Sequence, residues 1–143
     1  VRDLTKLCFL LERKYAPYGK WLGTAFAGLK CHCKIEPPLR AALRADTWRE
    51  REGALTEAAS LAGQLQNELG IAPSLDTGAR QFHNRPFLVI DASRFAEAVR
   101  FQISDGWIRG LPLSGGVDQF CDCVGITTDA EKSRSLRCLY TTR

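Results

Sequence analysis

The chain has 143 residues, of which 45% are apolar and 25% are charged. This length favours one domain with its own hydrophobic core, and the composition argues against a disordered chain. The net charge of +4 comes without a run of five or six like charges, so no basic tail is present. No apolar run approaches the roughly 18 residues of a membrane span.

Apolar spacing predicts helices through the N-terminal third. Residues 3–15 carry apolar side chains every three or four positions, and Pro17 ends that pattern. A second helix is expected over residues 18–34. The sequence Glu36-Pro37-Pro38 predicts a break, and residues 38–44 then suit a short helix.

The strongest helix signal follows at residues 47–69. Asp46 or Thr47 suits the N-cap, and Glu50 completes a capping box with Thr47. Gly70 supplies the C-terminal stop. The apolar stripe consists of Trp48, Leu55, Ala58, Ala59, Ala62, Leu65 and Leu69. Of these, the three leucines are expected to be largely buried.

The C-terminal half is richer in loops. A loop over 71–86 and a short strand over 87–90 are expected first. Asp91 or Ser93 then caps a helix that runs to about Ile103, with Phe95, Ala96, Val99 and Ile103 facing inward. A loop over 105–116, a short helix over 117–120 and a last helix from Asp129 complete the prediction. The predicted fold is therefore mainly α: a helical bundle with a loop-rich C-terminal half and at most one short β element.

Six cysteines are too few for a disulfide scaffold in a chain of this size. No signal peptide is visible, so reduced thiols and a cytoplasmic location are expected. Cys31-His32-Cys33 and Cys121-Asp122-Cys123 suggest zinc ligands. Only one residue separates each cysteine pair, and the first pair falls in a helical stretch where alternate residues face different ways. We therefore predict no metal site.

Standard catalytic and phosphate-binding motifs are missing. The sequence has no GxSxG turn, no Walker loop and no GxGxxG loop, and its only histidines are His32 and His83. We therefore predict no catalytic residue. A hydrolase-like reaction that uses His83 with a cysteine stays open as an alternative.

Two segments are dense in side chains that bind ligands. Tyrosine and tryptophan offer a ring with a hydrogen-bonding edge, and lysine and arginine offer charge for a phosphate or a carboxylate. The candidate ligand-binding residues are Tyr15, Tyr18, Lys20, Trp21, His83, Asn84 and Arg85. We expect them to share one groove for an anionic, ring-bearing or nucleotide-like ligand. The alternative is that both segments brace a helix junction.

These segments also carry a resemblance to a known family. Residues 15–29, 47–70, 85–90 and 117–120 resemble the bacterial domain-of-unknown-function 4037 family. In that family the helical domain follows a nucleotidyltransferase-like domain. The resemblance implies that residues 1–143 form the C-terminal, substrate- or partner-binding part of such a protein.

The same resemblance places the catalytic chemistry outside this chain. Nucleotidyltransferase-like domains hold Mg²⁺ on paired carboxylates after a Gly-Ser turn. Here Ser114-Gly115-Gly116 precedes Asp118 without an Asp-x-Asp pair. The resemblance therefore implies Mg²⁺ and a nucleotide for the missing half alone, and that half as the main partner. A stand-alone enzyme and a protein- or nucleic-acid-interaction module are the alternative functions, although the modest charge argues against nucleic acid.

Overall fold

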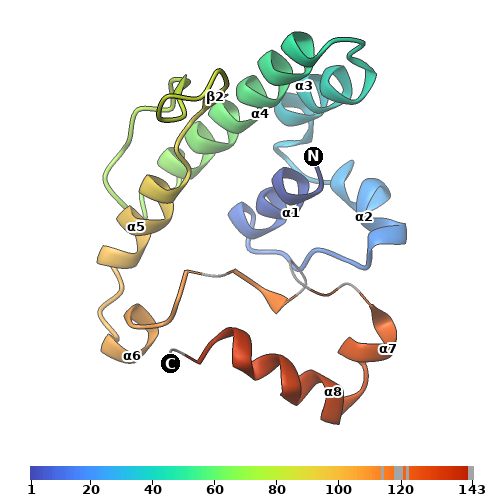
Figure 1. The fold of residues 1–143 in the computed structure, drawn as a ribbon, viewed down its shortest axis with the longest axis vertical. Coiled ribbons are helices and arrows are strands. Elements are labelled where there is room, and N and C mark those ends of the chain that lie inside the picture. The colour runs from blue at the N-terminus through green and yellow to red at the C-terminus, as the bar shows by residue number, and fades with distance from the viewer. Residues whose placement is uncertain (114, 118–120, 122, 142–143) are drawn as a thin grey trace. The chain divides into compact units, whose positions relative to one another are not determined.

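The computed structural model describes residues 1–113, 115–117, 121 and 123–141, and it is mainly helical (Figure 1). The chain divides into two compact units, Val1–Gln102 (unit 1) and Ile103–Arg143 (unit 2). The predicted fold class is confirmed: helices dominate both units, and the described residues form one small sheet of two strands. None of the described helices combines the length and apolar character that a membrane crossing requires.

Unit 1 begins with three helices: α1 (Arg2–Leu11), α2 (Gly19–Phe26) and α3 (His32–Arg44). The first two begin within one residue of the predicted positions, but both end earlier than predicted: α1 ends at Leu11, not at residue 15, and α2 ends at Phe26, not at residue 34. The break predicted at Glu36-Pro37-Pro38 is wrong, because α3 continues through both prolines, and the chain turns at residues 27–31 instead.

Packing explains how α3 accommodates its prolines. Each proline lacks the N–H that would bond to the carbonyl four residues earlier, which disfavours a helix interior. However, α3 buries Ile35, Pro38, Leu39 and Ala42 along one side, and its main neighbour is α4 (Trp48–Glu68). The free energy from this buried apolar surface offsets the two missing hydrogen bonds.

The ends of α4 agree with the sequence prediction. The Thr47 hydroxyl accepts a hydrogen bond from the Glu50 N–H at 3.2 Å, and the Glu50 carboxylate accepts one from the Thr47 N–H at 3.1 Å. Gly70 has a φ of +63°, the left-handed conformation that ends many helices. Both local signals are therefore confirmed.

The buried face of α4 differs from the predicted stripe. Leu55 and Leu65 are only half-buried, and Leu69 is exposed. The fully buried residues are small: Ala58, Ala62 and Gly63. Small side chains let neighbouring segments approach α4 closely, so the leucines lie at the edges of this contact.

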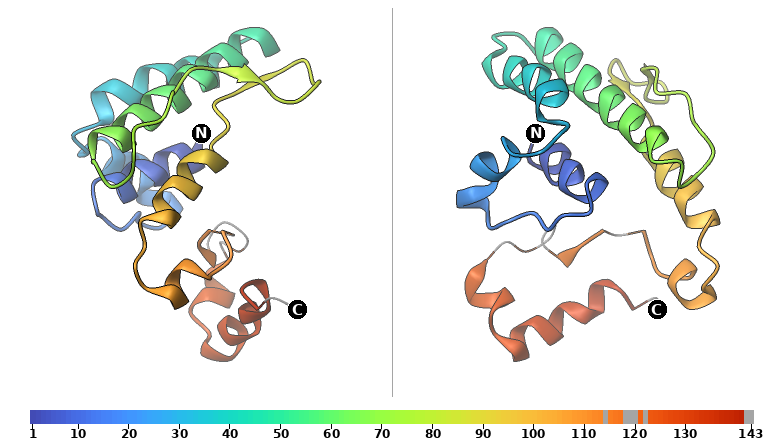
Figure 2. Two further views of the ribbon diagram at one scale, coloured as in Figure 1. Left: turned by 90° about the vertical axis from the view of Figure 1, so that its left-hand side faces the viewer. Right: turned by 180° about the vertical axis from the view of Figure 1, so that it is seen from behind.

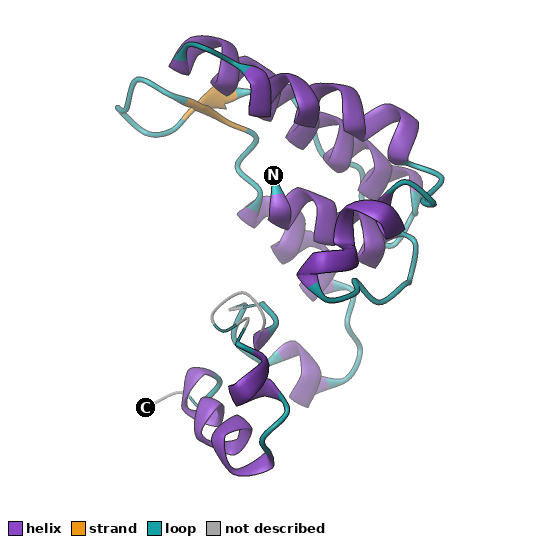
Figure 3. Cartoon of the chain, turned by 90° about the vertical axis from the view of Figure 1, so that its right-hand side faces the viewer, coloured by secondary structure: helices purple, strands orange, loops and turns teal. Residues whose placement is uncertain are grey.

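A short hairpin and a helix complete unit 1. Strands β1 (Arg80–Gln81) and β2 (Leu88–Val89) pair antiparallel, with Arg80 opposite Val89 and Gln81 opposite Leu88, beside α4 (Figure 3). Helix α5 (Ser93–Phe101) follows. Its N-cap is Ala92, not the predicted Asp91 or Ser93, since the Ser93 hydroxyl donates to the Asp91 carboxylate at 2.7 Å instead. Phe95 is buried as predicted, whereas Ala96 is exposed.

The core of unit 1 lies among α1, α2, α3 and α4 (Figure 2). Its buried residues are Cys8, Phe9, Leu22, Phe26, Leu29, Cys31, Ile35, Leu39, Ala58 and Ala62. Leu4 packs against this cluster from outside. This core fixes α1 relative to α4, and these two helices supply opposite sides of the pocket that is described below.

Unit 2 contains short elements. They are α6 (Gly106–Arg109), α7 (Val124–Thr127), α8 (Ala130–Ser135) and a 3₁₀-helix (Leu136–Leu139). The helix predicted from Asp129 is confirmed, because the Asp129 carboxylate accepts hydrogen bonds from two N–H groups of the first turn of α8. The helix predicted over 117–120 lies mainly outside the described residues. Among those that are described, unit 2 buries no side chain fully.

Candidate ligand-binding site

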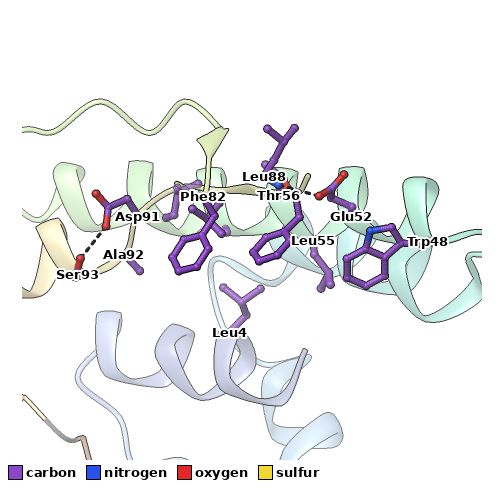
Figure 4. Close-up of a pocket in the computed structure, with 14 residues that line it drawn as sticks. Leu4, Trp48, Glu52, Leu55, Thr56, Phe82, Leu88, Asp91, Ala92 and Ser93 are labelled. Atoms are coloured by element: carbon purple, nitrogen blue, oxygen red, sulfur yellow. Dashed lines mark hydrogen bonds between the residues drawn. The ribbon is translucent and has the colours of Figure 1, made fainter. Parts of the chain in front are cut away.

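A pocket of about 540 Å³ lies in unit 1 between α4, the hairpin and the start of α5 (Figure 4). Leu4 of α1 closes one side. The lining residues are Leu4, Trp48, Glu52, Leu55, Thr56, Ala59, Phe82, Phe87, Leu88, Val89, Ile90, Asp91, Ala92 and Ser93. The volume is in the range of pockets that hold small organic ligands.

The walls of the pocket are mainly apolar. Figure 4 shows Leu4 opposite Leu55 and Phe82. The rings of Phe82 and Phe87 are stacked, with centroids 5.3 Å apart and planes 17° from parallel. The Phe82 N–H also donates to the Phe87 carbonyl at 3.0 Å, so the hairpin backbone holds both rings in place. Aromatic and aliphatic walls of this kind suit a ring or a hydrocarbon chain.

Glu52 is the polar residue at the edge of these walls. Its Oε1 accepts a hydrogen bond from the Leu88 N–H at 2.7 Å, across 36 residues of sequence (Figure 4). This charge-assisted bond joins α4 to β2. Among the residues that the structure describes, Oε2 of Glu52 has no hydrogen-bond partner. Glu52 therefore has acceptor capacity left for a ligand.

Asp91 is the second carboxylate in the lining. It accepts from the Ser93 hydroxyl and forms an ion pair with Arg94 at 3.4 Å. Asp91 has a φ of 55°, and His83 in the hairpin turn has a φ of 52°. Left-handed backbone is tolerated better by aspartate and histidine than by most residues. These two positions shape the segment that supplies most of the pocket wall.

The first set of predicted ligand-binding residues lies before and within α2. The side chain of Tyr15 is fully exposed, and those of Tyr18 and Trp21 are 57% and 58% exposed. The Lys20 ammonium lies 5.3 Å from the centre of the Trp21 ring, a cation–π contact. These residues form an aromatic, basic surface rather than part of the pocket.

The second set, His83, Asn84 and Arg85, forms the exposed turn of the hairpin. His83 meets the Phe82 ring edge-on at 4.6 Å, and the Arg85 N–H donates to the Phe82 carbonyl at 2.9 Å. Figures 1 and 2 show α2 and the hairpin apart in every view, so the structure does not bring the two sets together in one groove.

Sequence reasoning missed the residues that line the pocket, although two signals pointed to them. Phe82 directly precedes the predicted residues His83 to Arg85, and Phe87 follows them after Pro86. Glu52 lies four residues after Trp48, and hence on the same face of α4. An acidic residue beside an apolar stripe indicates a specific partner, which here is the Leu88 N–H.

The cysteines of unit 1 lie both in the core and on the surface. In the described part of the chain, no group of three or more histidine, cysteine, aspartate or glutamate side chains is placed to hold a metal ion. Cys8 and Cys31 are buried in the core, whereas Cys33 is exposed. Burial, together with neighbouring Cys31 and Glu12, raises the pKa of the Cys8 thiol to about 12.

Comparison with known proteins finds a partial match to a family model. The family model for a domain of unknown function (DUF4037) matches residues 1–22. This segment contains α1, the connection to α2 and the first residues of α2, including Leu4 of the pocket and the exposed aromatic residues. No curated protein and no solved structure matches the chain significantly. The similarity to the family therefore extends over the first 22 residues of the chain.

Proposed function

We propose that this chain is a helical substrate-binding domain of a bacterial, cytoplasmic, nucleotidyltransferase-like protein, and that it binds substrate in the pocket between α4 and the hairpin. The pocket is the observation that carries the proposal. The match of residues 1–22 to DUF4037 supports the family, and one residue of that segment, Leu4, lines the pocket. Magnesium and nucleotide belong, in this proposal, to the nucleotidyltransferase-like half.

The chemistry of the lining favours binding over catalysis. It offers apolar contact area and two carboxylates, and its fourteen residues include no histidine, lysine or cysteine. General acid–base catalysis near neutral pH usually employs a group that titrates there, most often histidine. The pocket therefore holds and orients a ligand, and chemistry is left to another domain.

A neutral aromatic probe tests this proposal. We expect 4-phenylbutan-1-ol to bind the chain, with chemical-shift changes in the amides of the hairpin and the first half of α4. Ala59→Leu adds bulk to the half-buried wall and should weaken binding about tenfold or more. Ala41→Leu makes the same change at an exposed position of α3 and should leave binding unchanged.

Two outcomes would contradict the proposal. One is a probe that does not bind the folded wild-type chain. The other is a probe that binds both variants equally well, since it then lies outside the pocket. Thermal unfolding of each variant separates loss of binding from loss of fold.

The exposed aromatic surface before and within α2 favours a second candidate, a protein-interaction module. The rings of Tyr15 and Trp21 are exposed. Aromatic residues are enriched at protein–protein interfaces, where a partner covers them. The partner in this candidate is the nucleotidyltransferase-like domain. Tyr15→Ser with Trp21→Ser should then weaken association of the two domains by about tenfold or more, measured by calorimetry. Trp107→Ser, at an exposed position of unit 2, is the matched control.

A further inference from the structure

We infer that the ligand of the pocket is an organic cation: an apolar ring or chain that carries a primary ammonium group, with the ammonium on Glu52. The inference rests on the proposed function, because it names the ligand class of that same site. It also differs from the prediction made from the sequence, which was an anionic ligand bound by a different set of residues.

Charge in the lining is the first argument. The lining contains two carboxylates, Glu52 and Asp91, and no lysine, arginine or histidine. A phosphate or carboxylate ligand would therefore be repelled and would find no basic group to neutralise it. An ammonium would gain a charge-assisted hydrogen bond instead.

Glu52, rather than Asp91, is the anchor. Asp91 already accepts from the Ser93 hydroxyl and pairs with Arg94. One carboxylate oxygen of Glu52 accepts the hydrogen bond from the Leu88 N–H, and the other has no hydrogen-bond partner in the described part of the chain. The bond to Leu88 also fixes the carboxylate, so little conformational entropy is lost when a ligand binds.

Nearby arginines are occupied by other groups. Arg51, next to Glu52 in sequence, donates to the carbonyls of Ala42 and Ala45 at the end of α3. Arg94 donates to two backbone carbonyls, those of Asp76 and Ile90, in addition to its ion pair. Both guanidinium groups are therefore engaged elsewhere, and neither forms an ion pair with Glu52 in the described part of the chain.

The apolar walls define the rest of the ligand. Leu4, Leu55 and the stacked pair Phe82 and Phe87 offer contact to a ring or a short chain. Aromatic faces also attract a cation that approaches them. The pocket is thus suited to a molecule with one charged end and one apolar end, and simple inorganic cations would leave the walls unfilled.

Three probes of nearly equal shape test the inference: 4-phenylbutylamine, 4-phenylbutan-1-ol and 4-phenylbutyrate. With the intact 143-residue chain, we expect the amine to bind about tenfold more tightly than the alcohol, and the carboxylate to bind most weakly. Calorimetry measures the affinities, and chemical shifts of the hairpin amides place each probe in the pocket.

Glu52→Gln is the decisive variant, because glutamine keeps an acceptor for the Leu88 N–H and removes the charge. It should lower affinity for the amine about tenfold and leave affinity for the alcohol unchanged. Glu57→Gln makes the same substitution at an exposed position of α4 outside the lining and should change neither. Should Glu52→Gln fail to fold, the wild-type chain still provides a test. Raising salt from about 0.05 M to about 0.5 M should reduce the preference for the amine.

The outcomes separate this inference from the proposed function. Equal affinity for the amine and the alcohol in the pocket overturns the inference on ligand charge, but it still agrees with the proposed substrate-binding function. A preference for the amine that Glu52→Gln does not change also overturns it. Binding of none of the probes overturns both proposals.

Discussion

Burial divides the cysteines of unit 1 into reactive and protected thiols. Cys8 is completely buried and has a pKa raised to about 12 by burial and by neighbouring Cys31 and Glu12. Because the thiolate is the nucleophile, such a thiol reacts slowly at neutral pH. Cys33 lies only two residues beyond buried Cys31 but is exposed.

We therefore expect iodoacetamide at about pH 8 to label Cys33 before the other cysteines of unit 1, and Cys8 only when the chain unfolds. Mass mapping of peptides over a time course measures the order. Labelling of Cys8 at the rate of Cys33 in folded protein would mean that α1 detaches readily from the core.

Glu12 joins the end of α1 to the start of α3. Its Oε1 accepts from the Cys31 N–H at 3.0 Å, and its other oxygen accepts from the Lys14 ammonium at 2.9 Å. Burial on its own would raise the pKa of this carboxyl, but the two hydrogen bonds outweigh burial and lower it below the ordinary 4.5. Because the pKa of this carboxyl is lower in the folded than in the unfolded state, its ionised form stabilises the folded protein at pH values above the unfolded-state pKa.

Glu12→Gln should therefore lower the free energy of unfolding by about 1 kcal/mol at pH 7. The difference from wild type should shrink as the pH falls below 4.5, because protonation then removes the same charge from the wild-type side chain. Urea unfolding at several pH values measures it. Asp3→Asn, at an exposed position of α1, is the control. A difference that is independent of pH would assign the effect to packing.

At the level of elements, α4 carries two glycines in contrasting surroundings. A Cβ at Gly53 would meet nothing within 4 Å. A Cβ at Gly63 would meet the Phe95 ring and the Thr77 methyl group at 3.1 Å. Phe95 is buried, so its ring cannot move aside easily.

Gly53→Ala should raise the free energy of unfolding by about 0.5–1 kcal/mol, because alanine favours the helix. Gly63→Ala should lower it by about 1–2 kcal/mol, because the crowding at Phe95 exceeds that gain. Chemical denaturation of both variants gives the comparison. Equal stabilisation by the two substitutions would show that the Phe95 ring can move away from Gly63 at little cost.

The ends of the elements were predictable where the signal was local. Thr47 and Glu50 cap α4, and Gly70 ends it, because these residues act on their own backbone or that of close neighbours. Pro37 and Pro38 gave a wrong break, because burial against α4 outweighs a local preference. Tertiary packing also decides which residues of α4 are buried: neighbouring segments approach closely at Ala58, Ala62 and Gly63, and the local apolar pattern did not predict this close approach.

The candidate site was less predictable than the fold, for a related reason. It combines Leu4, Glu52 and Leu88, which come from three separate elements. Local patterns identify residues with unusual chemistry, and they led to the hairpin turn at His83 to Arg85. They do not show that the Leu88 N–H of the hairpin meets the Glu52 carboxylate of α4, since that contact exists only after the chain has folded.

At the level of the whole molecule, burial is unevenly distributed between the two units. All of the fully buried residues that the structure describes lie between Thr5 and Phe95, within unit 1. The described part of unit 2 has none, and it exposes large apolar side chains such as Trp107 and Leu113. A cooperative unfolding transition requires a shared core, so unit 1 has the means to fold by itself.

We therefore expect a fragment of residues 1–102 to unfold cooperatively on heating, with helical content close to that of unit 1 in the full chain. Because the whole pocket lies in unit 1, the fragment should also bind 4-phenylbutan-1-ol with unchanged affinity. A fragment of residues 103–143 should show no cooperative transition, since segments of about 40 residues without a core or a staple rarely fold. Circular dichroism and calorimetry on both fragments test this. If residues 1–102 lose their transition and recover it when residues 103–143 are added, stability is shared between the units, and binding in the pocket requires the complete chain.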